Sequence, residues 1–220
     1  MSLTIYGTSA SRASRPLWAA HELGVTYQHE PIHYKDAGVK TPDFLALNPN
    51  GRIPALRDAR PDGEVIVWES MACVLYLARL YGQPDGQGIT PSTPAEEADA
   101  LRWAFWVVTA VEKEALSVLF QRMVLPAEQR NAEVLAVAVQ RLQAPMSILE
   151  QHLQQQQTKG CAYVAATRFT VADLILASVV AWAKPAAALF EQRPLLAAWL
   201  ENCLARPAQQ TVRALARQGR

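Results

Sequence analysis

The chain has 220 residues and a mass of 24.2 kDa, enough to bury a substantial core in one or two domains without disulfides or metal ions. Its 21 basic and 20 acidic residues give a formal net charge of +1, so no strong overall field attracts it to nucleic acid or to a membrane surface. A small-molecule partner is therefore the expected default, with no nucleic acid and no membrane partner.

Cysteine usage and the first residues bear on the compartment. Cys73, Cys161 and Cys203 are far apart in the sequence and form no CxxC pair, which favours a reducing compartment and argues against a disulfide framework. The N-terminal residues lack the basic start and longer apolar run of a signal peptide, and no apolar stretch approaches the length of a membrane span. We expect a cytoplasmic protein. The four histidines show no metal-ligand spacing, so no metal is expected.

The first eighty residues alternate between strand and helix patterns. Short alternating apolar runs predict strands, and apolar residues at helical spacing predict helices. The predicted order is a strand at 3–6, a helix from Ser14 to Gly24, a strand at 27–32, a helical turn at 43–47, strands at 55–58 and 65–68, and a helix at 70–81. Several α/β folds are compatible with this order.

Composition changes after Gly82. The segment 83–94 is rich in proline, glycine and small polar residues and is predicted to be a linker. Alanine- and leucine-rich segments follow and predict two long helices, at 95–123 and 127–157, the second kinked at Pro145. Thr170-Val171-Ala172-Asp173 has the spacing of a helix capping box, which is a structural role.

Two short motifs suggest a binding site. Asn48-Pro49-Asn50-Gly51 predicts a turn, and Ile53-Pro54 places a residue without a backbone N–H at the head of the next strand, as a strand edge or a cis turn. Glu69-Ser70 lies at a strand-to-helix corner, where a helix N-terminus can hold a carboxylate. A simple N-cap is the alternative for Ser70, and both roles can hold together.

The loop 8–15 joins the first strand to the first helix and contains three serines, Ser9, Ser11 and Ser14. Backbone N–H groups and the helix dipole converge there and stabilise an anion. Each serine can instead cap the helix, a role that suits Ser14, just ahead of Arg15-Pro16, best.

Together these motifs resemble those of the cytosolic glutathione S-transferases of serine type, whether phi-like, theta-like or bacterial, and the resemblance extends from Leu3 to about Arg206. It implies an α/β plus all-α fold: a thioredoxin-like glutathione-binding domain at 1–82, a linker at 83–94 and an all-helical domain at 95–220. It also implies a homodimer.

The resemblance assigns roles to particular residues. Ser11 matches the serine that donates a hydrogen bond to the glutathione thiolate, with Ser9 second, Ser14 third and Tyr6 a minor alternative. The other residues are matched to parts of glutathione, the co-substrate. The backbone groups of Ile53, before the cis Pro54, match those that bind the cysteinyl part, and Lys40 matches a lysine at the glycyl end. Ser70 matches the residue that binds the γ-glutamyl carboxylate, and Glu69 the one that binds the ammonium.

The implied function is activation of the glutathione thiol for conjugation to a small hydrophobic electrophile or for reduction of a peroxide. An isomerase of maleylacetoacetate type ranks lower, because Thr8-Ser9-Ala10-Ser11 does not reproduce the Ser-Ser-Cys-Ser run of those enzymes. The alternative from another class is a non-catalytic binding or regulatory module that keeps the fold and has lost the chemistry.

Overall fold

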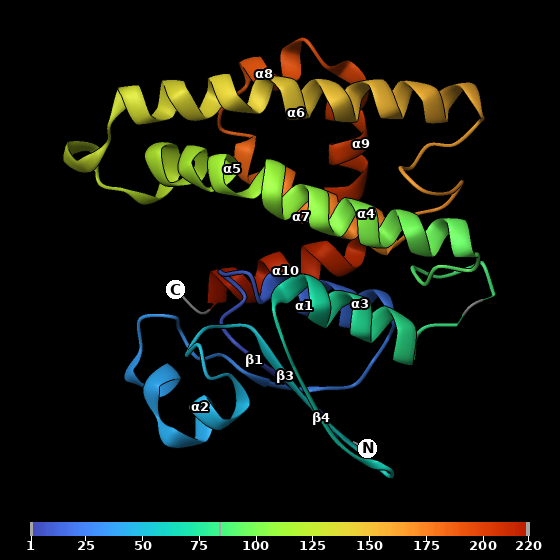
Figure 1. Cartoon of the computed structure of the whole chain (residues 1–220). Coiled ribbons are helices and arrows are strands. Elements are labelled where there is room, and N and C mark those ends of the chain that lie inside the picture. Colours follow the sequence, from blue (N-terminus) through green and yellow to red (C-terminus); the bar gives the residue numbers. More distant parts are fainter. Residues whose placement is uncertain (1, 84, 219–220) are drawn as a thin grey trace. The chain divides into compact units, whose positions relative to one another are not determined.

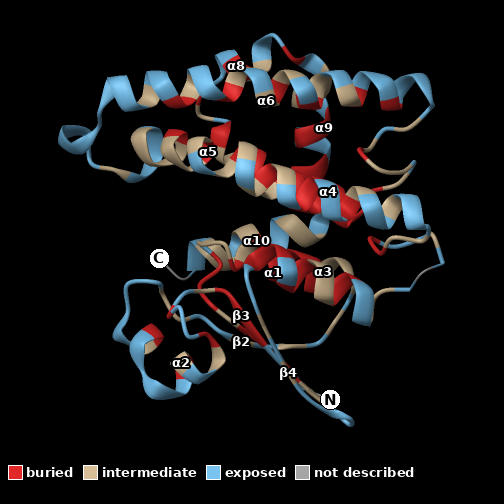
Figure 2. Cartoon of the chain, viewed as in Figure 1, coloured by how far each residue is buried: buried red, intermediate tan, exposed pale blue. Residues whose placement is uncertain are grey.

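The computed structural model describes residues 2–83 and 85–218. Met1, Pro84 of the predicted linker and the last two residues lie outside this part. Contacts divide the chain into two compact units: unit 1 is Met1–Pro91 with Ala205–Arg220, and unit 2 is Ser92–Leu204. Each unit has a buried core of its own (Figure 2).

Unit 1 is built on a four-stranded sheet (Figure 1). The strands are β1 (Ser2–Tyr6), β2 (Gln28–Glu30), β3 (Ala55–Arg60) and β4 (Gly63–Trp68). Their order is β2-β1-β3-β4, in which β1 and β2 are parallel while the β1–β3 and β3–β4 pairs are antiparallel. Every strand predicted in this region is present, with ends shifted by a few residues.

Helices cover both faces of this sheet. α1 (Ser14–Glu22) and α3 (Ser70–Tyr81) pack side by side on one face, and α2 (Pro42–Leu47) lies on the other with the short 3₁₀ helix η1 (Ala37–Lys40) (Figure 1). Fully buried apolar side chains of α1, α3 and the sheet form the core of this layer. The βαβ half (β1, α1, β2) and the ββα half (β3, β4, α3) together form the predicted thioredoxin-like arrangement.

A buried carboxylate fixes α3 on β3. Asp58 of β3 is fully buried and accepts hydrogen bonds from the hydroxyls of Tyr76 and Tyr81 on α3, each at 2.7 Å. Burial, together with the bond to Asp58, raises the pKa of Tyr76 to about 12. The tyrosines therefore stay protonated as donors at neutral pH, and the two bonds hold α3 in place over the sheet.

The last helix, α10 (Pro207–Gln218), groups with unit 1, unlike the predicted helical segment 95–220. Arg206, just before α10, makes a two-point ion pair with Glu22 of α1 at 2.6 and 2.7 Å, and Glu22 also accepts a hydrogen bond from Trp18. Val212 of α10 is buried. This pairing is long-range in sequence, so composition could not indicate it. The predicted boundaries at 82 and 94 remain a proposal.

Part of the predicted linker is packed rather than open. Thr90 is buried, and its hydroxyl donates to the carbonyl of Ala78 in α3 at 2.9 Å. Gly82, the residue after α3, lies directly against Thr90. A Cβ at position 82 would be only 1.6 Å from the Thr90 hydroxyl oxygen, so a glycine is needed there. Ile89 is buried as well. The segment before Pro91 is thus anchored to unit 1.

Unit 2 is helical throughout its regular structure. Its longer helices are α4 (Pro94–Ala110), α5 (Glu112–Leu119), α6 (Ala132–Thr158), α7 (Val171–Val180) and α9 (Pro194–Leu204); the shorter ones are η2 (Phe120–Val124), η3 (Ala127–Gln129), η4 (Ala181–Ala183) and α8 (Ala188–Glu191). Nearly every residue of α7 is buried, so α7 is the core helix of this unit. Among the described residues, no helix has both the length and the apolar character needed to cross a membrane.

The prediction of one continuous helix at 95–123 was wrong. The chain leaves helical geometry at Val111, where φ is −123° and ψ is −43°, and α5 begins at the next residue. Val111 is buried and carries a β-branched side chain, a type that is slightly unfavourable in helices. The second long helix, α6, runs unbroken through Pro145.

The predicted capping box at the start of α7 is confirmed. Asp173 is fully buried and accepts from both the backbone N–H and the hydroxyl of Thr170, at 3.0 and 3.1 Å. It also accepts from the backbone N–H of Val164 and from the indole of Trp199, each at 2.9 Å. Burial raises the pKa of Asp173, and the four donors act in the opposite direction. One carboxylate thus joins a loop, α7 and α9.

A second ion pair of unit 2 gives a pH-dependent prediction. Arg168 makes a two-point pair with Glu96 of α4 at 2.8 and 2.9 Å and holds the pKa of Glu96 below its ordinary value. A depressed carboxyl pKa contributes stability above the unfolded-state value, near pH 4.5, and this contribution is lost as the pH falls through the folded-state value. Glu96→Gln should therefore lower the free energy of unfolding by about 1 kcal/mol at pH 7 and by less at pH 4.

Urea unfolding of Glu96→Gln at the two pH values measures this difference. Asp99→Asn is the matched control, because Asp99 pairs with Arg102 on the same helix, where solvent screens the exposed arginine. An equal loss for Glu96→Gln at both pH values would contradict the prediction.

Candidate functional site

The sheet register gathers the predicted site residues at one end of unit 1. Tyr6 pairs with Ala55, and Ala55 pairs with Trp68. The C-terminal ends of β1 and β4 and the N-terminal end of β3 therefore lie at the same end of the sheet. Three segments meet there: the loop before α1, the Ile53-Pro54 pair and the corner before α3.

Gly7 brings the first two of these segments into contact. Its φ of 122° lies in the region that favours glycine, and a Cβ there would lie 2.9 Å from the Cβ atoms of both Ala13 and Ile53. His29 of β2 also holds this turn, because its Nε2 lies 2.9 Å from the Gly7 carbonyl oxygen. The start of α1 and Ile53 consequently lie against one another.

Ser11 lies at the N-terminal entry of α1 and is half-buried. Its hydroxyl donates to the carbonyl of Thr8 at 2.7 Å and accepts from the backbone N–H of Ala13 at 3.1 Å. The expectation that Ser14 best suits the cap is wrong: α1 begins at Ser14, its N-cap is Ala13, and Ser11 accepts the N–H. Because a turn precedes α1, the serine that accepts a backbone N–H is Ser11, three residues before Ser14.

The Ile53-Pro54 peptide bond is cis. Asn48, nearly fully buried, shapes the preceding loop by donating to the carbonyl of Arg52 at 2.7 Å and accepting from the N–H of Asn50 at 3.1 Å. Within the described chain, neither the N–H nor the C=O of Ile53 has an intramolecular hydrogen bond. Two backbone groups next to the start of α1 are thus available to an extended peptide.

Glu69 and Ser70 lie where β4 meets α3. Glu69 is exposed and has a φ of 70°, a conformation that non-glycine residues rarely adopt and that clusters at binding sites. Ser70 is the first residue of α3 and is buried. Its backbone N–H therefore belongs to the unpaired first turn of a twelve-residue helix, where a carboxylate is stabilised.

Arg15 is a component of this region that the sequence reasoning missed. It lies on α1, only 1% of it is exposed, and its Nη1 donates to the Ser70 hydroxyl oxygen at 2.8 Å. The bond joins the N-terminal turns of α1 and α3. The available signal was an arginine inside the helix-opening run of Arg15-Pro16-Leu17-Trp18, whose four residues are all buried.

Lys40 ends η1 and is exposed. It lies beside the loop that leads to Ile53, because a Cβ on Gly51 would come within 2.7 Å of the Lys40 ammonium nitrogen. Tyr6, the minor alternative, packs its ring edge-on against Phe44 at 6.1 Å and belongs to the small core under α2.

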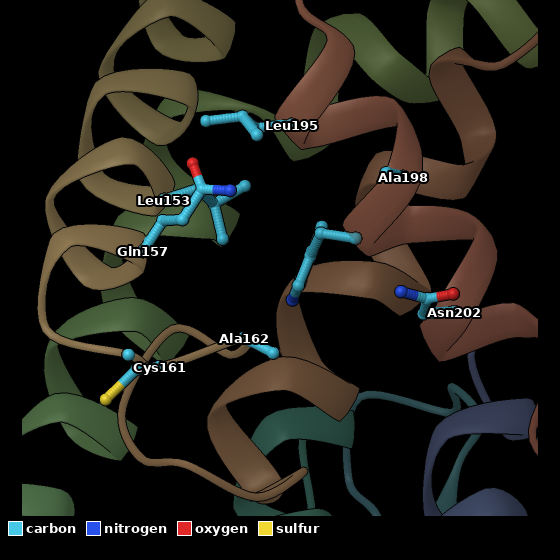
Figure 3. A pocket seen from close by; sticks show the side chains of 9 residues that line it. Leu153, Gln157, Cys161, Ala162, Leu195, Ala198 and Asn202 are labelled. Carbon is cyan, nitrogen blue, oxygen red and sulfur yellow. The ribbon is translucent and has the colours of Figure 1, made fainter.

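Unit 2 contains a hollow of about 320 Å³ between the end of α6 and α9 (Figure 3). Leu153, Leu195 and Trp199 line it together with the amides of Gln157 and Asn202. Cys161 is at its rim, and Figure 3 shows the sulfur directed away from the space. This lining offers no charged group or paired nucleophile, so the chemistry of the chain is better sought in unit 1.

Comparisons with known proteins agree with this fold. The family model described as glutathione S-transferase, N-terminal domain, matches residues 11–80, and the one described as glutathione S-transferase, C-terminal domain, matches 109–207. Glutathione S-transferase GstB of Escherichia coli K12 is 27% identical over 212 residues, covering 96% of this chain and 97% of the relative. Glutathione S-transferase 3 of Zea mays is 30% identical over 223 residues, covering 97% and 94%.

A solved structure gives the same result. The theta class glutathione S-transferase of Xanthomonas axonopodis pv. citri with glutathione bound has a TM-score of 0.79 and 29% identity, covering 96% of each chain. The chain therefore belongs to the glutathione S-transferase family, a family of enzymes whose co-substrate is glutathione. The predicted thioredoxin-like and all-helical fold class is confirmed.

Proposed function

We propose that unit 1 binds glutathione at the end of its sheet and activates the thiol as a thiolate, which attacks a small hydrophobic electrophile. One observation carries the proposal: the register of β1, β3 and β4 brings the backbone groups of Ile53, which have no hydrogen bond within the described chain, to the end of the sheet where α1 and α3 begin. An extended peptide can pair with Ile53 while its two ends and its thiol meet positive partial charges.

Each part of glutathione has a matching group. The N–H and C=O of Ile53 pair with the cysteinyl residue, and the first turn of α3 with Ser70 receives the γ-glutamyl carboxylate. The exposed carboxylate of Glu69 pairs with the γ-glutamyl ammonium, and Lys40 with the glycyl carboxylate. The resemblance of the motifs to those of the serine-type families supports these assignments.

The entry of α1 is then the place for the thiolate. A free thiol with a pKa near 8.5 is only about 3% ionised at pH 7, whereas a pKa near 6.5 makes roughly three quarters of it thiolate. The difference corresponds to about 2.7 kcal/mol of stabilisation of the anion over the thiol. A hydrogen bond to a charged acceptor together with a helix dipole is of this size.

Ser11 supplies the hydrogen bond and does not act as a base, since a serine hydroxyl is not ionised at this pH. In the structure the Ser11 hydroxyl donates to the carbonyl of Thr8. Rotation about the Cβ–Oγ bond aims the proton at the sulfur while the oxygen keeps the N–H of Ala13. The retained N–H polarises the hydroxyl and strengthens it as a donor.

The same thiolate serves two reactions. Attack on an electrophilic carbon forms a thioether and expels the leaving group. Attack on a peroxide oxygen forms a sulfenic acid and an alkoxide, which takes up a proton, and a second glutathione then gives the disulfide and water. We propose conjugation as the main reaction and peroxide reduction as a second one.

Steady-state assays of the wild-type protein with an activated chloroarene and with an organic hydroperoxide test this proposal. Turnover that saturates in glutathione and is inhibited competitively by S-methylglutathione is expected. If glutathione raises the melting temperature but neither electrophile is turned over, the enzyme proposal fails and the non-catalytic binding module replaces it.

We also propose a cytoplasmic homodimer. Within the described residues no disulfide joins Cys73, Cys161 and Cys203, which suits a reducing compartment. Each unit carries exposed apolar side chains of the kind that oligomers bury: Ile66 and Trp68 on the edge strand β4, and Leu101 and Phe105 one turn apart on α4.

Phe105 is 69% exposed, and Phe105→Glu should convert the dimer to a monomer because it places a charge in an apolar contact. Light scattering after gel filtration distinguishes twice the chain mass of 24.2 kDa from a single chain. Met123→Glu is the matched control, since Met123 is 65% exposed in η2, outside these two patches. A wild-type protein that is monomeric at micromolar concentration would contradict the dimer.

A further inference from the structure

Arg15 connects two helix termini that the proposed glutathione site uses. It is the second residue of α1, and the acceptor of its 2.8 Å hydrogen bond, the Ser70 hydroxyl, is on the first residue of α3. Both side chains are buried. The two residues are 55 positions apart in the sequence, so the bond is a tertiary contact at the site and not a local turn.

The direction of this bond determines what Ser70 can do. A guanidinium has donors and no acceptor, so Ser70 must accept from Arg15. The hydroxyl proton of Ser70 is then left for another acceptor, and no acceptor for it is found in the part of the chain that the structure describes. Because the free N–H groups of the first turn of α3 begin at the same residue, the proton and these N–H groups form one donor set for an anion.

The charge of Arg15 acts in the same sense. A guanidinium carries a positive charge in proteins, and burial of Arg15 reduces the screening of that charge by solvent. A carboxylate that accepts from Ser70 would be one hydroxyl away from this cation. The orientation of the hydroxyl therefore favours an acceptor such as a carboxylate, and the hydrogen bond from the cation makes that hydroxyl a stronger donor.

We propose that Arg15 is a positioning residue for the co-substrate: acting through Ser70, it makes the N-terminus of α3 selective for the α-carboxylate of the γ-glutamyl residue. The inference rests on the proposed function and deepens it, since it assigns the recognition of one end of glutathione to a residue that does not touch it.

The test compares glutathione with 4-aminobutanoyl-Cys-Gly, which lacks only that carboxylate. Dissociation constants for both peptides, and KM and kcat for glutathione, are measured for the wild-type protein and for Arg15→Met. We expect Arg15→Met to raise the dissociation constant and KM of glutathione roughly 10- to 100-fold, to leave kcat within about threefold, and to leave the analogue unaffected. Arg15→Lys should recover part of the loss.

Three further variants sharpen the result. Arg79→Met removes an exposed arginine from the last turn of α3 and should change neither affinity. Ser70→Ala should lose the same preference for glutathione over the analogue. The double variant Arg15→Met with Ser70→Ala should bind glutathione no more weakly than the single variant that binds it more weakly.

An equal loss of affinity for both peptides in Arg15→Met would overturn the inference, because a purely structural role does not distinguish them. If Arg15→Met does not fold, an unchanged preference in Ser70→Ala overturns it equally. A wild-type protein that binds neither peptide would instead refute the proposed function, so the two failures are distinguishable.

Discussion

Ser11→Ala is expected to reduce kcat for conjugation about 10- to 100-fold at pH 7 and to raise the apparent pKa of bound glutathione. The variant removes the hydrogen-bond donor that we propose for the thiolate, so that only the N-terminus of α1 would stabilise the anion. The loss should shrink above about pH 8.5, because the thiol then ionises without assistance. A pH profile of kcat together with the thiolate absorbance of the bound peptide measures both effects.

Ser14→Ala is the matched control for this variant, since Ser14 is half-buried in the first turn of the same helix. It should retain turnover within about threefold. Ser11→Ala also removes the acceptor for the N–H of Ala13, which should cost about 1 kcal/mol of stability without unfolding the protein. If Ser9→Ala or Ser14→Ala alone abolishes turnover, the assignment of Ser11 is incorrect.

Asp173→Ala is expected to lower the free energy of unfolding of unit 2 by about 3–5 kcal/mol. The substitution leaves four donors without their acceptor: two on Thr170, the N–H of Val164 and the indole of Trp199. All of these lie in a fully buried region, where water cannot replace the carboxylate. Urea unfolding followed by circular dichroism measures the change.

Trp199→Phe provides the comparison for Asp173→Ala. It keeps an aromatic ring in the core and removes only one of the four donors, so a loss of about 1–2 kcal/mol is expected. If Asp173→Ala lowers the free energy of unfolding by less than about 1 kcal/mol, the carboxylate does not hold α7, α9 and the loop at Val164 together.

Local chemistry explains why much of the fold was predictable. The strands of unit 1, α3 and the capping box at Thr170 are each encoded within a few consecutive residues, through alternation, helical spacing and cap chemistry. The Ile53-Pro54 and Glu69-Ser70 motifs were likewise visible as short patterns. The register of β1, β3 and β4 then places those motifs at one end of the sheet.

Features that depend on distant residues were not predictable. The bond from Arg15 to Ser70 and the pairing of Arg206 with Glu22 join residues 55 and 184 positions apart, and no local pattern marks them. The break at Val111 lies within an otherwise helical sequence. Ser11 rather than Ser14 accepts the capping N–H because the chain makes a turn before α1, in which the N–H of Ser14 donates to the carbonyl of Ser11.

The most direct test of the account is a titration of the wild-type protein with glutathione near neutral pH, following the melting temperature and the ultraviolet absorbance of the thiolate together. A saturable rise in the melting temperature, accompanied by thiolate absorbance in proportion to the bound fraction, is the result we predict. No response of either signal up to millimolar glutathione would contradict a working glutathione site in unit 1.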